Sequence, residues 1–162
     1  MGILNVTPDS FSDGGEWFAF DAAIAHARDL IAQGADILDV GGESTRPGAG
    51  PVDVDEELGR VVPVVATLRD AGAQISVDTM KLGVAEKAVE AGATYVNDVT
   101  AFRHEPELAG FVADRGCDCC LMHMLGEPRT MQQNPVYDDV VDDVRAFLEE
   151  RAHFAVGAGV PE

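Results

Sequence analysis

The feature that most constrains the fold of this chain is a pattern that occurs four times. In each copy, a glycine and two further residues are followed by a short apolar run that reads as a strand. The glycines are Gly34, Gly72, Gly92 and Gly116, and the predicted strands are residues 37–40, 75–78, 95–98 and 119–123. A glycine just after a helix adopts the conformation that ends it, so each copy predicts a helix followed by a strand. With the opening run, residues 2–6, the sequence predicts five strands.

Helical periodicity fills the segments between these strands, because apolar residues recur there three and four positions apart. The predicted helical faces are Ala23, Ala27, Leu30 and Ile31; Leu58, Val61, Val62, Val65 and Leu68; Val84, Ala88 and Val89; Leu108, Phe111 and Val112; and Val140, Val144, Phe147 and Leu148. Asp53, three residues before Glu56, predicts an acidic variant of the capping box at the start of the second helix.

Five consecutive strand and helix units with nearly continuous apolar strands predict a parallel sheet covered by helices. A doubly wound sheet would place a G-x-G-x-x-G fingerprint at its first strand-to-helix turn, and that turn has none here. A (β/α)₈ barrel instead places polar residues at the carboxyl ends of many strands. The polar residues that end or nearly end a predicted strand are Asn5, Asp39, Asp78, Asn97 and His123. We therefore predict an α/β fold of the (β/α)₈ TIM barrel class.

The length of the chain predicts that this barrel is incomplete. Five units in 162 residues take about 32 residues each, whereas eight units need about 250. We expect residues 1–162 to form a single barrel domain whose C-terminal part is missing. Because such a piece exposes strand edges, we expect it in isolation to fold poorly or associate through those edges, and to be inactive.

Composition limits the partners that such a chain can have. Its 29 acidic and 11 basic residues give a net charge of −18, which repels nucleic acid and anionic membranes. No apolar run reaches the ~18 residues of a membrane helix, and no basic and apolar leader opens the chain. Cys117, Cys119 and Cys120 form no disulfide framework, and we interpret them as small buried hydrophobes rather than zinc ligands. We expect a cytoplasmic protein.

Polar residues at the strand ends are the first candidates for a binding site. Each could be a turn or N-cap residue, but Asn5, Asp78 and Asn97 on separate parallel strands favour a shared site. Asp78 and Asn97 supply the hydrogen-bond acceptors that suit a flat heterocycle with N–H groups along one edge. His123 either lines this pocket or is a buried core imidazole.

Two long loops follow the first two predicted strands. Residues 7–18 are rich in Ser, Asp and Gly, and residues 41–50 contain Ser44, Thr45 and Arg46. Hydroxyls, backbone N–H groups and an arginine suit an anion such as pyrophosphate. Because the chain is so acidic, a divalent cation would help to bring that anion in.

Longer motifs resemble a known family. Residues 1–15 read MGILNVTPDSFSDGG and residues 39–48 read DVGGESTRPG, and both resemble the dihydropteroate synthases of folate biosynthesis. Residues 75–79, 96–98 and 121–124 resemble the third, fourth and fifth strands of that family, in order. The resemblance covers the whole chain and implies a transferase that is a homodimer when full length. Its reaction would join p-aminobenzoate to 6-hydroxymethyl-7,8-dihydropterin pyrophosphate, giving 7,8-dihydropteroate and pyrophosphate.

The same resemblance implies which residues bind the pterin. Asp78 and Asn97 are expected to accept hydrogen bonds from the edge of the ring. The expected lining of the ring pocket is Val99, Cys120 and Met122.

The other half of the implied site binds pyrophosphate and p-aminobenzoate. Asn5 resembles the ligand of Mg²⁺, which makes Mg²⁺ the implied cofactor. Loss of pyrophosphate builds negative charge, which Mg²⁺ and Arg46 would stabilise, and positive charge on the pterin methylene, which Asp9 would stabilise. The remaining implied contacts are Thr45 with pyrophosphate and Phe11 and Pro47 with the p-aminobenzoate ring.

Two alternatives remain open. A methyltransferase of the pterin-binding superfamily would keep Asp78 and Asn97 but would not need a pyrophosphate loop. An inactive fragment or interaction module would not need the loop motifs, which read intact. The family's sixth-, seventh- and eighth-strand motifs do not occur in this sequence, and residues 100–103 depart from the small glycine-rich run expected there.

Overall fold

The computed structural model describes residues 1–7, 15–44, 50–128 and 130–162, with the backbone alone for residues 15–19. Strands and helices alternate along this part of the chain. In order, they are β1 (Gly2–Asn5), α1 (Gly15–Ala32), β2 (Ile37–Gly41), α2 (Val54–Leu68), β3 (Gln74–Asp78), α3 (Leu82–Ala91), β4 (Tyr95–Asp98), α4 (Glu107–Arg115), β5 (Asp118–Leu121) and α5 (Val140–Gly157).

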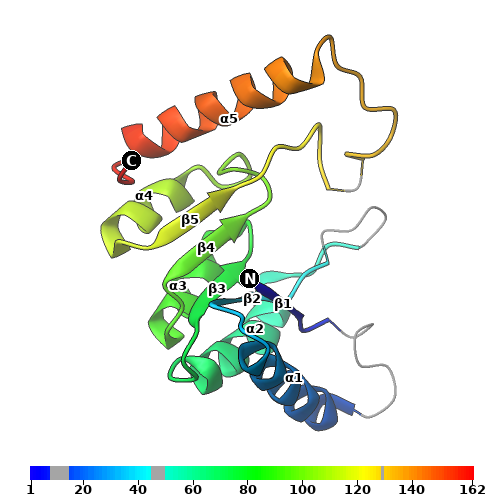
Figure 1. Ribbon diagram of the computed structural model, residues 1–162, viewed down its shortest axis with the longest axis vertical. Helices are drawn as coiled ribbons and strands as arrows, with labels where there is room; N and C mark the ends of the chain where they lie inside the picture. The colour runs from blue at the N-terminus through cyan, green and yellow to red at the C-terminus, as the bar shows by residue number, and fades with distance from the viewer. Residues whose placement is uncertain (8–14, 45–49, 129) are drawn as a thin grey trace.

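The strands form one parallel sheet in which each strand pairs with the next in the sequence, from β1 to β5. Helices α1 to α4 cover one face of this sheet (Figure 1). This is the arrangement of consecutive units in a (β/α) barrel, and it confirms the predicted fold class as a partial barrel.

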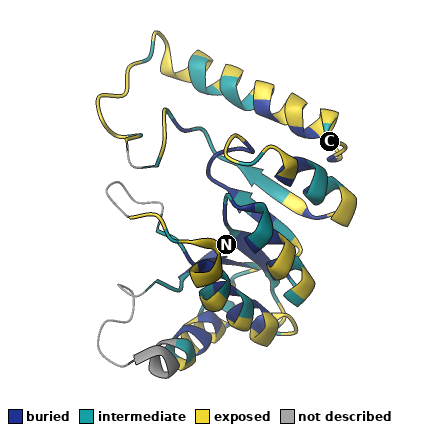
Figure 2. Ribbon diagram, turned by 180° about the vertical axis from the view of Figure 1, so that it is seen from behind, coloured by how far each residue is buried: buried dark blue, intermediate teal, exposed yellow. Residues whose placement is uncertain are grey.

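The two faces of the sheet differ in chemistry. Alternate strand residues point to opposite faces. The helix-covered face is apolar and buried, and its largest members include Leu4, Leu38, Val40, Ile75 and Val77. Figure 2 shows this buried layer between the sheet and the helices. The other face carries mainly polar residues, so a buried apolar core on one side supports a polar surface on the other.

The helix ends follow the sequence prediction closely. Gly34, Gly72, Gly92 and Gly116 all have positive φ, as predicted for glycines that end helices. Asp53 caps α2 by accepting a hydrogen bond from the backbone N–H of Glu56 at 2.8 Å. The end of the last strand was predicted two residues too late, because β5 ends at Leu121 rather than at residue 123, and its start one residue too late, because β5 begins at Asp118.

Helix α5 lies along the far end of the structure, beyond β5 and α4 (Figure 1). Arg151 and Ala155 are its buried residues, while Val140 and Val141 at its start are exposed. Arg151 fixes its position by donating to the backbone carbonyl of Ala101 at 2.8 Å. None of the helices in the described part of the chain is long and apolar enough to cross a membrane.

A single methyl group at Gly42 is predicted to destabilise the contact between β2 and α2. A Cβ atom there would lie 2.8 Å from Cγ2 of Val61 and 3.0 Å from Cγ of Glu57. We expect Gly42→Ala to lower the free energy of unfolding by about 1–3 kcal/mol in denaturant titrations. Gly59→Ala is the control, because it lies in the exposed part of α2 with no atom within 4 Å, and it should stabilise the helix slightly. Equal effects of the two substitutions would contradict this packing.

Candidate functional site

The carboxyl ends of the strands bring five residues into one row across the open face of the sheet. The register pairs Asn5 with Gly41, Gly41 with Asp78, Asp78 with Asn97, and Asn97 with Cys120. We call these five residues the strand-end row. A Cβ atom on Gly41 would lie 3.4 Å from Oδ2 of Asp78 and 3.6 Å from Oδ1 of Asn5. The glycine therefore leaves open the space between these two polar side chains.

Asp78 has a buried side-chain oxygen that no described residue satisfies. This atom is Oδ1, which has no hydrogen-bond partner among the described residues. Burial, followed by the negative charges of Asp39, Glu57, Asp98 and Glu43, raises the pKa of Asp78 to about 7. A buried carboxylate oxygen without a donor is costly, so this geometry suits a ligand that brings an N–H group to it.

Asp39 lies in β2, two residues before Gly41 of the strand-end row, and it accepts hydrogen bonds from Ser76 of β3 and Asn97 of β4. It is 3% exposed, and its Oδ1 accepts a hydrogen bond from the hydroxyl of Ser76 at 2.6 Å. Its Oδ2 accepts one from Nδ2 of Asn97 at 2.9 Å. Asp39 was predicted from the sequence to lie near a strand end, but it was not among the predicted site residues. An acid inside the apolar run 37–40 was the signal that could have identified it.

A second polar cluster closes the base of the loop that follows β2. Nζ of Lys81 donates to Oε2 of Glu43 at 2.8 Å, to Oε2 of Glu57 at 2.5 Å and to the backbone carbonyl of Val52 at 2.6 Å. The hydroxyl of Thr79 donates to Oε1 of Glu57 at 2.7 Å. We call these five residues the Lys81 cluster.

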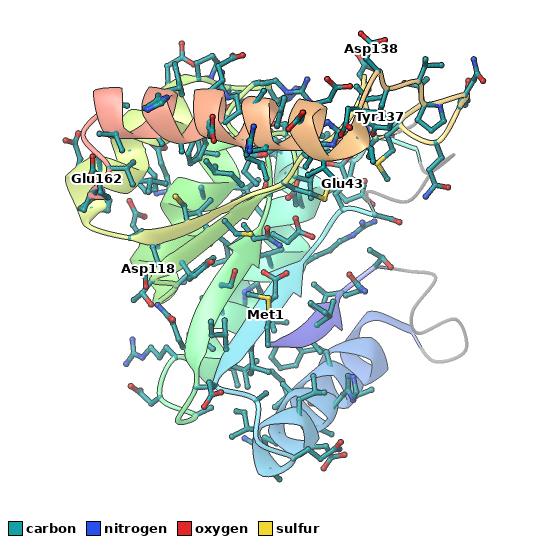
Figure 3. The ribbon with its side chains drawn as sticks, turned by 45° about the horizontal axis from the view of Figure 1, so that its top comes forward. Met1, Glu43, Asp118, Tyr137, Asp138 and Glu162 are labelled. Atoms are coloured by element: carbon teal, nitrogen blue, oxygen red, sulfur yellow. The ribbon has the colours of Figure 1, made fainter. Side chains whose placement is uncertain are left out.

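The Lys81 cluster is almost sealed from solvent. Glu57 is fully buried, and the side chains of Lys81 and Glu43 are each 10% exposed. Burial lowers the pKa of Lys81, but the hydrogen bonds that its ammonium group donates to Glu43 and Glu57, together with their negative charges, outweigh burial and raise the pKa above its ordinary value. Glu43 also accepts the backbone N–H of Val52 at 3.2 Å, so the two ends of the loop are held together. Figure 3 shows Glu43 and Asp118 at opposite ends of the sheet, with Glu43 at the end that carries the strand-end row. The sequence prediction missed this cluster.

The three predicted pocket residues lie near the strand-end row but differ in position. Cys120 belongs to the row itself and is a half-buried free thiol. Val99 directly follows β4 and is buried, and Met122 directly follows β5 and is half-buried. All three therefore come from the ends of β4 and β5, next to Asn97.

The loop after β4 is held by a buried acid. Asp98 is fully buried and accepts hydrogen bonds from the backbone N–H groups of Thr100 and Phe102 at 2.7 and 2.8 Å. This arrangement accommodates positive φ values of 53° at Ala101 and 60° at Phe102. The residues that depart from the expected glycine-rich run therefore form a turn fixed by Asp98.

His123 is half-buried rather than a buried core imidazole, and it directly follows Met122 after the end of β5. Its ring contacts Phe147 of α5 edge-on at a centroid distance of 4.9 Å and Tyr137 at 5.8 Å. The guanidinium of Arg103 lies 5.0 Å over the same Phe147 ring and donates to the backbone carbonyl of Met124 at 3.0 Å. These residues attach α5 to the loops after β4 and β5.

The predicted residues of the two long loops lie outside the described part of the chain. These residues are Asp9, Phe11, Thr45, Arg46 and Pro47.

Asn5 is the described residue that the sequence assigned to Mg²⁺. Its side-chain oxygen lies at the end of β1 in the strand-end row. Among the described residues, no three His, Cys, Asp or Glu side chains are grouped to hold a metal ion. Mg²⁺ commonly takes one or two protein oxygens and completes its shell with water and substrate phosphates, so a single amide oxygen is compatible with it.

Three comparisons relate the chain to known proteins. Its residues 1–162 match the family model described as pterin binding enzyme. It is 47% identical to a dihydropteroate synthase of Bacillus subtilis, over 100% of the chain and 55% of that protein. It superposes with a TM-score of 0.90 and 51% identity on a Xanthomonas albilineans dihydropteroate synthase solved with 4-aminobenzoic acid, covering 99% of this chain and 57% of that one.

A third relative was solved with 7,8-dihydropteroate. The chain matches a Burkholderia cenocepacia dihydropteroate synthase complexed with 7,8-dihydropteroate with a TM-score of 0.85 and 50% identity, over 99% of this chain and 54% of that one. The chain therefore spans a little more than half the length of these relatives.

Proposed function

This chain belongs to the pterin-binding enzyme family, and we propose that it is part or all of a dihydropteroate synthase of folate biosynthesis. The proposed reaction forms a bond between the amine of p-aminobenzoate and the methylene carbon of 6-hydroxymethyl-7,8-dihydropterin pyrophosphate. The carbon–oxygen bond to pyrophosphate breaks, and 7,8-dihydropteroate results. The observation that carries the proposal is the buried, unpartnered Oδ1 of Asp78 beside Asn97 in the strand-end row.

The strand-end row is proposed to bind the edge of the pterin ring. A pterin carries adjacent N–H groups, and the unpartnered oxygen of Asp78 would accept one of them. Asn97 lies directly opposite Asp78 on the next strand and would accept a second. Val99, Cys120 and Met122 would contact the flat faces of the ring, because they follow or end the two neighbouring strands.

The departing pyrophosphate is proposed to lie at the β1 and β2 side of the row. Asn5 would ligate Mg²⁺ there, together with oxygens of the substrate. When bound, Mg²⁺ would neutralise charge on the pyrophosphate. Arg46 and Thr45 would contact the same group, Asp9 would stabilise the cationic pterin methylene, and Phe11 and Pro47 would flank p-aminobenzoate. These five assignments follow from the sequence motifs.

The reaction needs no covalent bond to the protein. The amine of p-aminobenzoate is itself the nucleophile, so the work of the chain is to orient the two rings and to stabilise opposite charges as they develop. A rigid row on strand ends suits this task, because its residues are fixed by the sheet register.

We predict that pterin affinity rises about tenfold between pH 6 and pH 8. The pKa of Asp78 is raised from 3.8 to about 7, so below pH 7 the free site holds a proton. A ring N–H favours the ionised carboxylate, so binding releases that proton, and affinity falls as pH drops through 7. Calorimetry with 6-hydroxymethyl-7,8-dihydropterin measures this profile. Asp78→Asn should flatten it, and a flat profile in the unchanged protein would contradict the prediction.

Turnover of the natural protein tests the proposed function. Incubation with both substrates and Mg²⁺ should form 7,8-dihydropteroate and pyrophosphate in equal amounts. A protein that binds pterin but forms no product, or that transfers a methyl group from methyltetrahydrofolate instead, would overturn the proposal in favour of one of the two alternatives.

The resemblance and the composition also support proposals for the oligomeric state and the cellular location of the protein. We propose a homodimer in the cytoplasm that binds these small molecules rather than nucleic acid or membranes. The net charge of −18 and the free thiols of Cys117, Cys119 and Cys120 are compatible with that setting. Sedimentation of the purified natural protein would test the dimer.

A further inference from the structure

The orientation of the Asn97 side-chain amide is fixed by its hydrogen bond to Asp39. A carboxylate can only accept hydrogen bonds, so the contact between Asp39 and Asn97 must use the N–H side of the amide. Nδ2 of Asn97 accordingly lies 2.9 Å from Oδ2 of Asp39. Among the described residues, no group donates a hydrogen bond to the other amide atom, Oδ1 of Asn97. The carbonyl side of this amide is therefore available to a ligand.

Asp39 is itself held in place. The hydroxyl of Ser76 donates to its second oxygen at 2.6 Å, and both groups are buried. All three residues come from adjacent paired strands, β2, β3 and β4. The chain from Ser76 through Asp39 to Asn97 is thus a short polar network inside a rigid sheet.

Stability of the fold does not explain why position 39 is a buried acid. Burial of a carboxylate is costly, and its charge also disfavours ionisation of Asp78, whose pKa it raises. A neutral residue could fill the same position with less electrostatic cost. Retaining an acid makes sense if the Asn97 amide must present only one of its two sides.

We propose that Asp39 is a positioning residue that holds the Asn97 amide with its oxygen toward the ligand. With Asp39 in place, Asp78 and Asn97 present acceptors side by side, and the site selects rings with two neighbouring N–H donors on one edge. Without it, the amide is free to turn, and an N–H group would then face a ring N–H. The inference rests on the proposed function only for the choice of pterin as the probe.

Calorimetry with 6-hydroxymethyl-7,8-dihydropterin at pH 8 tests this role in the natural protein. Asp39→Asn should weaken binding about tenfold, because the new amide can pair with either side of Asn97. In an Asn97→Ala background the same substitution should change affinity less than about twofold. Ser76→Ala is the matched control: it perturbs the same buried acid but leaves its contact with Asn97, and should change affinity less than about threefold.

Three results would overturn the proposal. They are unchanged affinity in Asp39→Asn, equal losses in the two backgrounds, or a loss in Ser76→Ala as large as that in Asp39→Asn. A merely structural role of Asp39 predicts the second and third of these.

An NMR measurement tests the same inference without requiring that Asp39→Asn folds or that the protein binds pterin. The side-chain NH₂ signals of Asn97, assigned by their loss in Asn97→Ala, should show one proton shifted downfield and protected from exchange. Asp39→Asn should remove this signature, and pterin should leave it in place. If the natural protein binds no pterin, the proposed function fails, while this signature still decides the role of Asp39. Its absence in the unchanged protein would overturn the inference, even if Asp39→Asn did not fold.

Discussion

Replacing Asp78 with asparagine is expected to weaken pterin binding by about 10- to 150-fold while making the ligand-free fold more stable. The loss of affinity follows because a hydrogen bond to a buried carboxylate contributes roughly 1.5–3 kcal/mol. The gain in stability follows because Asp78 is buried without a donor on Oδ1, close to four other acids. Removing its charge should raise the free energy of unfolding by about 1–3 kcal/mol at pH 8.

The opposite signs of these two effects distinguish a binding residue from a structural one. Calorimetry with 6-hydroxymethyl-7,8-dihydropterin gives the first, and denaturant unfolding without ligand gives the second. Asp70→Asn, at an exposed position, is the control and should change neither. If Asp78→Asn destabilised the fold and left pterin affinity unchanged, Asp78 would be a structural residue and not part of the pterin site.

Replacing Lys81 with methionine is expected to lower the free energy of unfolding by about 3–5 kcal/mol. Nζ of Lys81 is the shared donor to Glu43, Glu57 and the backbone carbonyl of Val52. Without it, two nearly buried carboxylates face each other with no positive charge between them. The base of the loop after β2 also loses its contact with the start of α3, so the effect should reach the loop as well as the core.

Two further variants locate the cause of that loss. Lys87→Met removes an exposed lysine paired with exposed Glu90, and should change unfolding little. Adding Glu57→Gln to Lys81→Met should recover part of the stability, because one buried charge is then gone. A loss in Lys81→Met no larger than that in Lys87→Met would refute the role assigned to the Lys81 cluster.

Much of the fold could be predicted from the sequence because its signals are local. Glycines such as Gly92 and Gly116 end helices through their own backbone conformation, and the apolar spacing in α2 marks the face that packs on the sheet. Polar residues at strand ends also share one edge of any parallel sheet, so grouping Asn5, Asp78 and Asn97 needed no knowledge of distances.

The polar clusters were missed because they depend on register and on contacts distant in the sequence. Glu43 and Lys81 are 38 positions apart, and Lys81 and Glu57 are 24 apart. Asp39 lies in β2, where four consecutive residues from Leu38 to Gly41 are buried, so burial within the run does not reveal which face a residue occupies. Only the pairing of β2, β3 and β4 shows that Asp39 lies beneath Asn97.

The end of β5 was misplaced for a related reason. The apolar run continues through Met122 and Met124, but pairing with β4 stops at Leu121 opposite Asp98. His123 consequently leaves the sheet and contacts Phe147.

A crystal structure of the natural protein with 6-hydroxymethyl-7,8-dihydropterin tests the central claim most directly. We predict that ring N–H groups lie within hydrogen-bond distance of Oδ1 of Asp78 and of Oδ1 of Asn97, with the Asn97 amide still bound to Asp39. The 6-hydroxymethyl group should point toward Asn5 and the loops after β1 and β2. A pterin bound elsewhere, or one that leaves Oδ1 of Asp78 without a donor, would contradict the assignment of the strand-end row as the pterin site.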